Sequence, residues 1–335
     1  MSAHSSSVSD CLLVGDIGGT NARFALYDSS GGSDGAGKLL VRQTFAASDF
    51  ARFTDAVNAF LQRSGVEASQ LKGASFAVAS PLAGQEIRFT NSPWCFSRES
   101  LRSEIGVSRL TLVNDFEALA HGVPRMIEDG LRPLRQGEGD ERSPKLVLGP
   151  GTGLGVAAIL PLYLDDRMIW RPVPGEGGHV AFAPIDDFEL DFLKYLQVRH
   201  DRVSVERIVC GDGLVSLYHF ILARARKTRP EPVTPAWVAS EALAGDAIAK
   251  DAVMRFLAAL GSFAGDCALI YVARGGVYFG GGVLPKIWPL VSDSPLVDRF
   301  NSKGRMSPWV SMIPLKLIVD DTVALRGAAI AAEHG

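Results

Sequence analysis

The sequence predicts an α/β fold built from two related halves that face a common cleft. The chain has 335 residues, which is enough for two domains with a substantial core. Apolar segments of strand length occur together with segments of helical periodicity. A hairpin pattern with a glycine-rich tip occurs twice, at residues 12–27 and 145–160, about 130 residues apart. This repeat indicates that each half begins with the same kind of hairpin.

The chain is expected to divide into a tail and two domains. Residues 1–10 are polar and rich in serine, which predicts a disordered tail and not a signal peptide. We predict that residues 11–125 and 317–335 form a small α/β domain. Residues 126–316 form the large α/β domain.

The first half carries five predicted strands and a helix. The strands are expected at residues 12–15, 23–27, 39–44, 74–79 and 110–113. Between Phe50 and Leu61 apolar residues recur at spacings of three and four. This spacing predicts an amphipathic helix over residues 50–63, which Gly65 ends.

The second half repeats the strands and adds more helices. Strands are expected at residues 145–148, 154–160 and 276–279, and a final strand and helix fill residues 314–333. Helices are expected at residues 186–198, 211–226, 234–244 and 246–264. Residues 128–144 are polar and contain glycine and proline, so we predict an inserted loop there.

The composition is that of an ordinary soluble protein of the cytoplasm. The chain is 47% hydrophobic and 21% charged, and its formal net charge of -3 gives no global attraction to nucleic acid or to an anionic membrane. Its four cysteines form no CxxC pair, which indicates reduced thiols. Residues 256–273 have the length of a membrane span but contain Asp266, so we expect a buried helix.

Glycine-rich turns are the first functional signal. They lie at residues 18–20, 151–153 and 280–282, each beside a predicted strand. Such turns can present backbone N–H groups to phosphate oxygens, although each is also what a tight hairpin needs by itself. The sequence has no GxxxxGK[ST] motif and no GxGxxG that opens a helix, which excludes a P-loop and leaves a dinucleotide fold unsupported.

Asp16 stands at the tip of the first hairpin, beside residues 18–20. A carboxylate beside a polyphosphate would repel it unless a divalent cation lay between them. Mg²⁺ prefers one or two carboxylates together with water and phosphate oxygens, so Asp16 is a candidate ligand that acts through water. Capping of the turn amides is the structural alternative.

Six ordered motifs carry a resemblance to a known family. They are DIGGTNARFAL, LVNDFEALA, GPGTGLGVA, PGEGGHVAFAP, SVERIVCGDGLVSLY and GGVYFGGGVLPK. Together they resemble the bacterial-type, ATP-dependent glucokinases of the sugar kinase/heat-shock ATPase/actin superfamily. The resemblance implies two ribonuclease-H-like (actin-like ATPase) domains that flank a central cleft. The related repressor/ORF/kinase group usually carries a zinc-binding cysteine cluster, which this sequence lacks.

The resemblance also implies the ligands and their residues. The expected substrates are glucose and ATP with Mg²⁺, and a homodimer is implied by the resemblance only. The nucleotide-binding residues it implies are Gly18, Gly19, Thr20, Asn21, Gly151, Thr152, Gly153, Gly280, Gly281 and Gly282. The sugar-binding residues it implies are Asn114, Asp115, Glu176, His179 and Glu206, with Asp115 as the catalytic base.

Asp115 has a chemical argument of its own. It follows a predicted strand and precedes a predicted helix, where a carboxylate can face a cleft. Phosphoryl transfer to an alcohol needs a group that receives the hydroxyl proton. Aspartate is also favoured as a helix cap, and only the other motifs favour catalysis over that role.

The charges of the predicted sugar site favour a neutral polyol. Asp115, Glu176 and Glu206 are acidic, and Arg207 is the one cation within those motifs. A carboxylate accepts hydrogen bonds from sugar hydroxyls, whereas an acidic substrate would need a cationic clamp. Asn91, in the stretch TNSPW, is a further candidate for closing over the sugar, although the adjacent Trp94 fits a core anchor equally well.

Three other functions remain as alternatives. The chain could be a hexokinase-type enzyme with a broader or different sugar preference. It could be a sugar-sensing regulator without turnover, but ten serine-rich residues cannot form a DNA-binding helix-turn-helix. An ATPase that acts on protein clients would need a separate client-binding domain, for which no segment is apparent.

Overall fold

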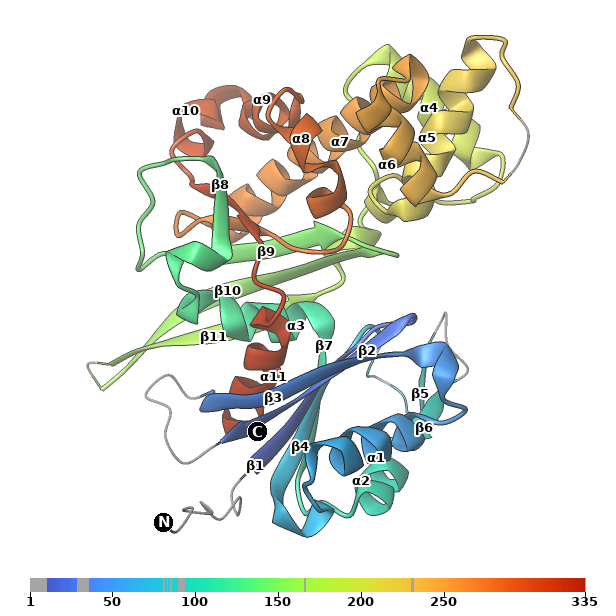
Figure 1. Cartoon of the computed structure of the whole chain (residues 1–335). Coiled ribbons are helices and arrows are strands. Elements are labelled where there is room, and N and C mark those ends of the chain that lie inside the picture. Colours follow the sequence, from blue (N-terminus) through green and yellow to red (C-terminus); the bar gives the residue numbers. More distant parts are fainter. Residues whose placement is uncertain are drawn as a thin grey trace. The chain divides into compact units, whose positions relative to one another are not determined.

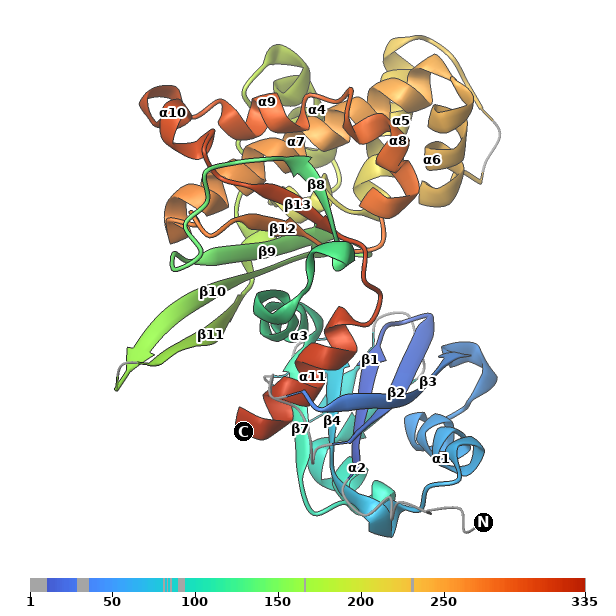
Figure 2. The same ribbon diagram turned by 60° about the vertical axis from the view of Figure 1, so that its left-hand side comes forward.

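The structure is a computed structural model that describes residues 11–28, 36–80, 82, 84, 86–89, 94–165, 167–229 and 232–334. The chain forms two compact units (Figures 1 and 2). Unit 1 comprises the described residues of Met1–Met126 and Asp320–Gly335, and unit 2 comprises those of Ile127–Val319. The predicted tail at residues 1–10 lies outside the described residues.

Unit 1 is built on a five-stranded sheet with the order β3-β2-β1-β4-β7. Its strands are β1 (Cys11–Ile17), β2 (Asn21–Asp28), β3 (Lys38–Ala46), β4 (Leu71–Val78) and β7 (Leu110–Asn114). β1, β2 and β3 are antiparallel neighbours, while β4 and β7 continue parallel to β1. A small hairpin of β5 (Glu86–Arg88) and β6 (Cys95–Ser97) stands apart from this sheet.

Helices cover both faces of the unit 1 sheet (Figure 2). They are α1 (Phe53–Ser64), α2 (Arg98–Ile105), α3 (Asp115–Gly122) and α11 (Val323–His334). Alternate residues of β1 point to opposite faces, so Leu13 packs with α1 and α2, whereas Leu12 and Val14 pack with α3 and α11. Gly65 ends α1 in the left-handed conformation, with φ of 67°.

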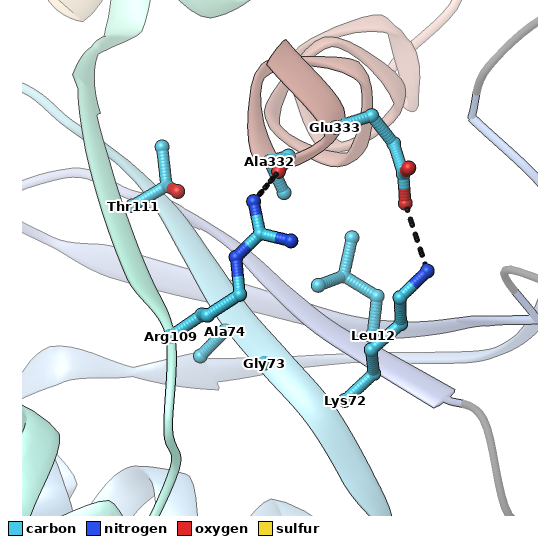
Figure 3. A pocket seen from close by; sticks show the side chains of 8 residues that line it. All are labelled: Leu12, Lys72, Gly73, Ala74, Arg109, Thr111, Ala332 and Glu333. Carbon is cyan, nitrogen blue, oxygen red and sulfur yellow. Dashed lines mark hydrogen bonds and ion pairs between the residues drawn. The ribbon is translucent and has the colours of Figure 1, made fainter. Parts of the chain in front are cut away.

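The C-terminal helix α11 is held closely in unit 1. A Cβ atom on Gly327 would lie 1.7 Å from the carbonyl oxygen of Ala118, so only glycine lets α11 and α3 approach this closely. Figure 3 shows the other end of the helix, where Arg109 donates to the Ala332 carbonyl at 3.0 Å and Lys72 pairs with Glu333 at 3.6 Å. The helix therefore covers one face of the sheet that begins with β1.

Unit 2 is built on a six-stranded sheet with the order β11-β10-β9-β12-β13-β8. Its strands are β8 (Leu131–Arg135), β9 (Lys145–Pro150), β10 (Leu154–Leu164), β11 (Arg167–Gly175), β12 (Val277–Phe279) and β13 (Leu315–Ile318). β9, β10 and β11 are antiparallel, and β12 and β13 run parallel to β9. The first five strands of this sheet therefore repeat the topology of unit 1, which confirms the predicted repeat.

Helices of unit 2 pack into one large core. They are α4 (Asp187–Gln197), α5 (Gly211–Arg224), α6 (Pro235–Ala244), α7 (Ala247–Tyr271), α8 (Trp288–Val291), α9 (Leu296–Asn301) and α10 (Ser307–Val310). α7 is long and apolar enough to cross a membrane by length and composition, but 67% of its most apolar 18-residue window is buried inside the protein. It is thus the buried core helix that the sequence predicted.

The prediction for residues 128–144 is wrong in part. Instead of a continuous loop, this segment contains β8, which pairs antiparallel with β13 at one edge of the sheet. β11, at the opposite edge, was also not predicted as a strand. Both carry proline, Pro133 in β8 and Pro172 and Pro174 in β11. Proline is tolerated at sheet edges, where one row of N–H groups needs no partner strand.

Candidate active site

Asp115 is the first residue of α3 and directly follows β7. Asn114 acts as the helix cap, since its side chain accepts from the Phe116 N–H at 2.9 Å, and Glu117 completes a capping box with the Asn114 N–H at 3.4 Å. The Asp115 Oδ1 atom also accepts from the Phe116 N–H, at 3.0 Å. The capping role that the sequence left open for Asp115 therefore belongs mainly to Asn114.

Asp16 lies in β1, opposite Arg23 of β2 across the first hairpin. Arg23 Nη1 donates to Asp16 Oδ2 at 2.8 Å, and the Asp16 side chain is 18% exposed. Burial raises the pKa of the Asp16 carboxyl, while the charge and hydrogen bond of Arg23 act in the opposite direction. The sequence analysis missed Arg23. Its position directly across the hairpin from Asp16 could have indicated that the two side chains pair.

The first glycine turn, residues 18–20, joins β1 to β2 in unit 1. The Gly18 N–H donates to the Asn21 carbonyl at 2.9 Å, and the Thr20 carbonyl accepts from the Ala47 N–H at 2.8 Å. These bonds fix the turn on both sides.

The second and third glycine turns lie together in unit 2. β9 and β12 are parallel neighbours, so the turns that follow them meet at the same edge of the sheet. A Cβ atom on Gly149 would lie 2.0 Å from the Gly280 carbonyl oxygen. Gly281 has a positive φ of 82°, and a Cβ there would lie 2.4 Å from the Pro150 oxygen. Residues 151–153 and 280–282 thus form a contiguous backbone surface.

Several amides of these turns are available to a ligand. Among the described residues of these three turns, six backbone N–H groups donate to no protein acceptor. They belong to Gly19, Thr20, Thr152, Gly153, Gly281 and Gly282. The Gly211 N–H, at the N-terminus of α5, donates to the Gly151 carbonyl at 3.0 Å and fastens the second turn to that helix.

Three of the predicted sugar-binding side chains come together in unit 2. The His179 imidazole lies between two carboxylates, with its Nε2 atom 3.8 Å from Glu176 Oε2 and its Nδ1 atom 3.8 Å from Glu206 Oε1. The exposed fraction of the side chain falls from 78% in Glu176 through 60% in His179 to 28% in Glu206. The group therefore presents two acidic acceptors around one imidazole.

A short antiparallel contact holds this group together. The Val205 N–H donates to the Val180 carbonyl at 3.0 Å, and the Phe182 N–H donates to the Val203 carbonyl at 3.1 Å. Arg202 adds a bond from Nη1 to the His179 carbonyl at 2.6 Å. These contacts join the segment that carries His179 to the segment that carries Glu206.

Two glycines of PGEGGH lie close to β10. In the structure a Cβ atom on Gly178 would lie 2.3 Å from the Leu154 carbonyl oxygen, and one on Gly177 would lie 3.2 Å from Val156. These glycines let the loop pack closely against β10.

Asn91 lies outside the described residues. The neighbouring Trp94 is buried, its Nε1 atom donates to the Phe50 carbonyl at 3.0 Å, and its ring packs edge-on against Phe53 at 5.4 Å between ring centroids. Trp94 is therefore the core anchor that was one of the two interpretations.

The residues present suit a magnesium ion that is held largely by its substrate. Among the described residues, no group of three or more His, Cys, Asp or Glu side chains could hold a metal ion. Mg²⁺ does not need such a cage, because it keeps waters and phosphate oxygens as ligands. A cation near Asp16 would also stabilise a carboxylate that burial now disfavours.

Known proteins resemble this chain over nearly its whole length. The family model named Glucokinase matches residues 13–335. The glucokinase of Chromohalobacter salexigens is 42% identical over 322 residues, which cover 96% of this chain and 97% of the relative. The crystal structure of a glucokinase from an Antarctic psychrotroph has a TM-score of 0.81 at 31% identity, over 97% of this chain and 99% of the other.

A more distant structure shares the fold. The ROK family glucokinase from Streptomyces griseus, in complex with glucose and AMPPNP, has a TM-score of 0.62 at 18% identity, over 97% of this chain and 100% of the other. These likenesses and the repeated strand order confirm the predicted class of two ribonuclease-H-like halves. The resemblance stated from the six motifs is likewise confirmed, and the chain belongs to the glucokinase family.

Proposed function

We propose that this member of the glucokinase family transfers the γ-phosphoryl group of ATP to the 6-hydroxyl of glucose, with Asp115 as the general base. The observation that carries the proposal is the match of the Glucokinase model to residues 13–335. The ROK family glucokinase from Streptomyces griseus, which shares the fold, was solved with glucose and AMPPNP bound. This chain therefore has the architecture of a protein that holds both kinds of ligand.

Asp115 supplies the proton acceptor in this proposal. It stands at the first position of α3, directly after β7. As the bond from the sugar oxygen to phosphorus forms, the carboxylate receives the hydroxyl proton. A positioned general base of this kind contributes about 10²- to 10⁴-fold to the rate. Asn114 beside it caps the helix and so fixes the backbone that carries the base.

In this proposal the sugar is held by hydrogen bonds to three side chains of unit 2. Glu176 and Glu206 accept from sugar hydroxyls, and the His179 imidazole between them can donate or accept. A substrate that lacks one of those hydroxyls leaves a carboxylate without its donor, at a cost of about 1–3 kcal/mol. This arrangement supports a neutral hexose as the acceptor substrate.

ATP is bound mainly by backbone amides. The turns at residues 18–20 and 151–153 have free N–H groups that would bind the phosphates. Residues 280–282 would bind the adenosine, as the resemblance implies. Asp16 would hold Mg²⁺ through water, and the bound ion would neutralise charge on the phosphate oxygens. The cytoplasmic location, the cleft between two domains and the homodimer stay predictions from the sequence.

An Asp115→Ala variant tests the proposal. We expect kcat for glucose to fall by at least 10²-fold, while calorimetry shows that glucose still binds, more weakly. Asp49→Asn, an exposed carboxylate of the same unit, is the control and keeps its kcat. Normal turnover by Asp115→Ala would remove Asp115 as the base.

The substrate is tested by ADP release with a panel of acceptors. The panel contains glucose, mannose, fructose, N-acetylglucosamine and glycerol, and we expect the highest kcat/KM for glucose. A preference for glycerol or for the amino sugar would overturn the assignment. Equal rates with the three hexoses would support the broader hexokinase, and binding without ADP release would support a sugar sensor.

A further inference from the structure

Leu154, the first residue of β10, is the point where three parts of the site meet. Its N–H donates to Glu206 Oε2 at 2.8 Å. Its carbonyl oxygen lies against Gly178, where a Cβ atom would come within 2.3 Å. Leu154 also follows the second glycine turn directly. The segments that carry His179 and Glu206 therefore both contact Leu154, at the end of a predicted phosphate loop.

Glu206 uses its two carboxylate oxygens for different neighbours. Oε2 bonds to the Leu154 amide, whereas Oε1 faces His179 Nδ1 at 3.8 Å. The side chain is only 28% exposed, so the carboxylate is largely shielded from water by these neighbours. One charged group thus touches the phosphate loop on one side and the sugar-binding imidazole on the other.

Gly153 is what allows this contact. A Cβ atom at this position would lie 2.5 Å from Glu206 Oε2 and 3.2 Å from its Cδ. Any side chain here would displace the carboxylate from the Leu154 N–H. Gly151, two residues earlier in the same turn, has no neighbouring atom within 4 Å of its Cβ position. Within this turn, the need for glycine beside Glu206 is therefore specific to Gly153.

We propose that Glu206 is a positioning residue that couples the binding of the two substrates. The proposal rests on the proposed function, in which residues 151–153 contact ATP and Glu206 contacts glucose. A sugar that fixes the carboxylate also orders the loop through Leu154, so the nucleotide then binds to a loop that is already held. By thermodynamic linkage the nucleotide must strengthen sugar binding by the same factor, which is about 5- to 150-fold in typical coupled sites.

Gly153→Ala is the sharpest variant for this coupling. The new methyl group meets the end of a flexible side chain, so the chain can fold while Glu206 moves away. We expect the KM for glucose to rise about tenfold, although residue 153 belongs to the nucleotide loop. The matched control is Gly151→Ala, for which we expect a glucose KM within twofold of the wild type, whatever its KM for ATP.

The coupling itself is measured by calorimetry on the full chain. The Kd for glucose is determined with and without saturating AMPPNP and Mg²⁺. In the wild type we expect glucose to bind at least fivefold more tightly with the nucleotide present. In Gly153→Ala and in Glu206→Gln, which keeps the size of the side chain and loses its charge, we expect the ratio to fall below twofold. A general loss of structure would weaken both Kd values without removing their ratio.

The outcomes separate this coupling from the proposed function. If the wild type releases no ADP with glucose, the proposed function itself is wrong. If the wild type phosphorylates glucose but shows no coupling, or if both variants keep the wild-type ratio, then only the positioning role of Glu206 is overturned. An equal rise of the glucose KM in Gly151→Ala and Gly153→Ala would also overturn it. If Gly153→Ala does not fold, Glu206→Gln alone decides.

Discussion

Asp16 is a largely buried carboxyl group, and its burial disfavours the charged form. It pairs with Arg23, yet burial raises its pKa above the ordinary value of 3.8. The folded protein therefore binds this proton more tightly than the unfolded chain does. As the pH rises from about 3.8 through the pKa of the folded protein, this carboxyl lowers the free energy of unfolding.

An Asp16→Asn variant tests both the loss of stability caused by this carboxylate and its proposed role in binding ATP. We expect its free energy of unfolding to exceed that of the wild type at pH 7, and the difference to shrink as the pH falls towards 3.8, because protonation removes the cost of burying the carboxylate. Urea unfolding at several pH values measures it. We also expect kcat/KM for ATP to fall about 10- to 100-fold, because Asp16 would hold Mg²⁺ through water in the proposed function. A variant that is less stable than the wild type at pH 7 would contradict the direction of the pKa shift.

Single residues also show what the sequence could and could not predict. The position of Asp115 between a strand and a helix was predictable, because both patterns are local. Arg23, which pairs with Asp16, was missed because this pairing depends on the register of the hairpin. The packing role of Gly178 was missed, because the Leu154 carbonyl that it meets is distant in the sequence.

At the scale of elements, the interior strands of the unit 2 sheet were predicted and its two edge strands were not, whereas both edge strands of the unit 1 sheet, β3 and β7, were predicted. β9 is an apolar run that is buried along its whole length. β8 and β11 lie at the two edges and are partly exposed, and their prolines indicate a loop to any local analysis. The helix boundaries were predicted within a few residues where caps mark them, as at Gly65 and Gly245.

The contact between α3 and α11 gives a prediction at this scale. In Gly327→Ala the new methyl would lie 1.7 Å from the Ala118 carbonyl oxygen, so the helices must separate by more than about 1 Å. Because α3 begins with Asp115, we expect kcat to fall by up to about 10²-fold, as misplacements of this size can cause. Calorimetry should show that glucose still binds within threefold of the wild-type Kd.

The control for this contact is Ala331→Gly in the same helix. It destabilises α11 by about 1 kcal/mol in helix propensity but adds no atom to the contact. We expect its melting temperature to fall while its kcat stays close to that of the wild type. Equal losses of kcat in the two variants would show that helix stability, and not the position of Asp115, was affected.

At the scale of the whole molecule, the repeated topology was predicted from two glycine-tipped hairpins. The return of the C-terminal segment to the small domain was also predicted, but the exact boundaries were not, because no local signal marks where the chain passes from one unit to the other. The predicted domain boundaries follow residues 125 and 316, whereas the compact units change after residues 126 and 319. The assignment of these units as functional domains stays a prediction.

Removal of the segment after Val319 tests the dependence of unit 1 on α11. In such a chain the face of the sheet that carries Leu12 and Val14 loses the part of its cover that α11 provides and keeps α3. We expect hydrogen exchange to become fast in β1, β4 and β7 and to remain slow in β9 and β10, which belong to unit 2. Slow exchange in β1 of the shortened chain would show that unit 1 is stable without the helix.

The interrupted path of unit 1 has a consequence for biosynthesis. All 193 residues of Ile127–Val319 leave the ribosome before α11 does. At a translation rate of 5–20 residues per second, the apolar face of the nascent sheet lacks α11 for about 10 to 40 s. During that interval chaperones and neighbouring nascent chains compete for the surface that α11 will finally cover.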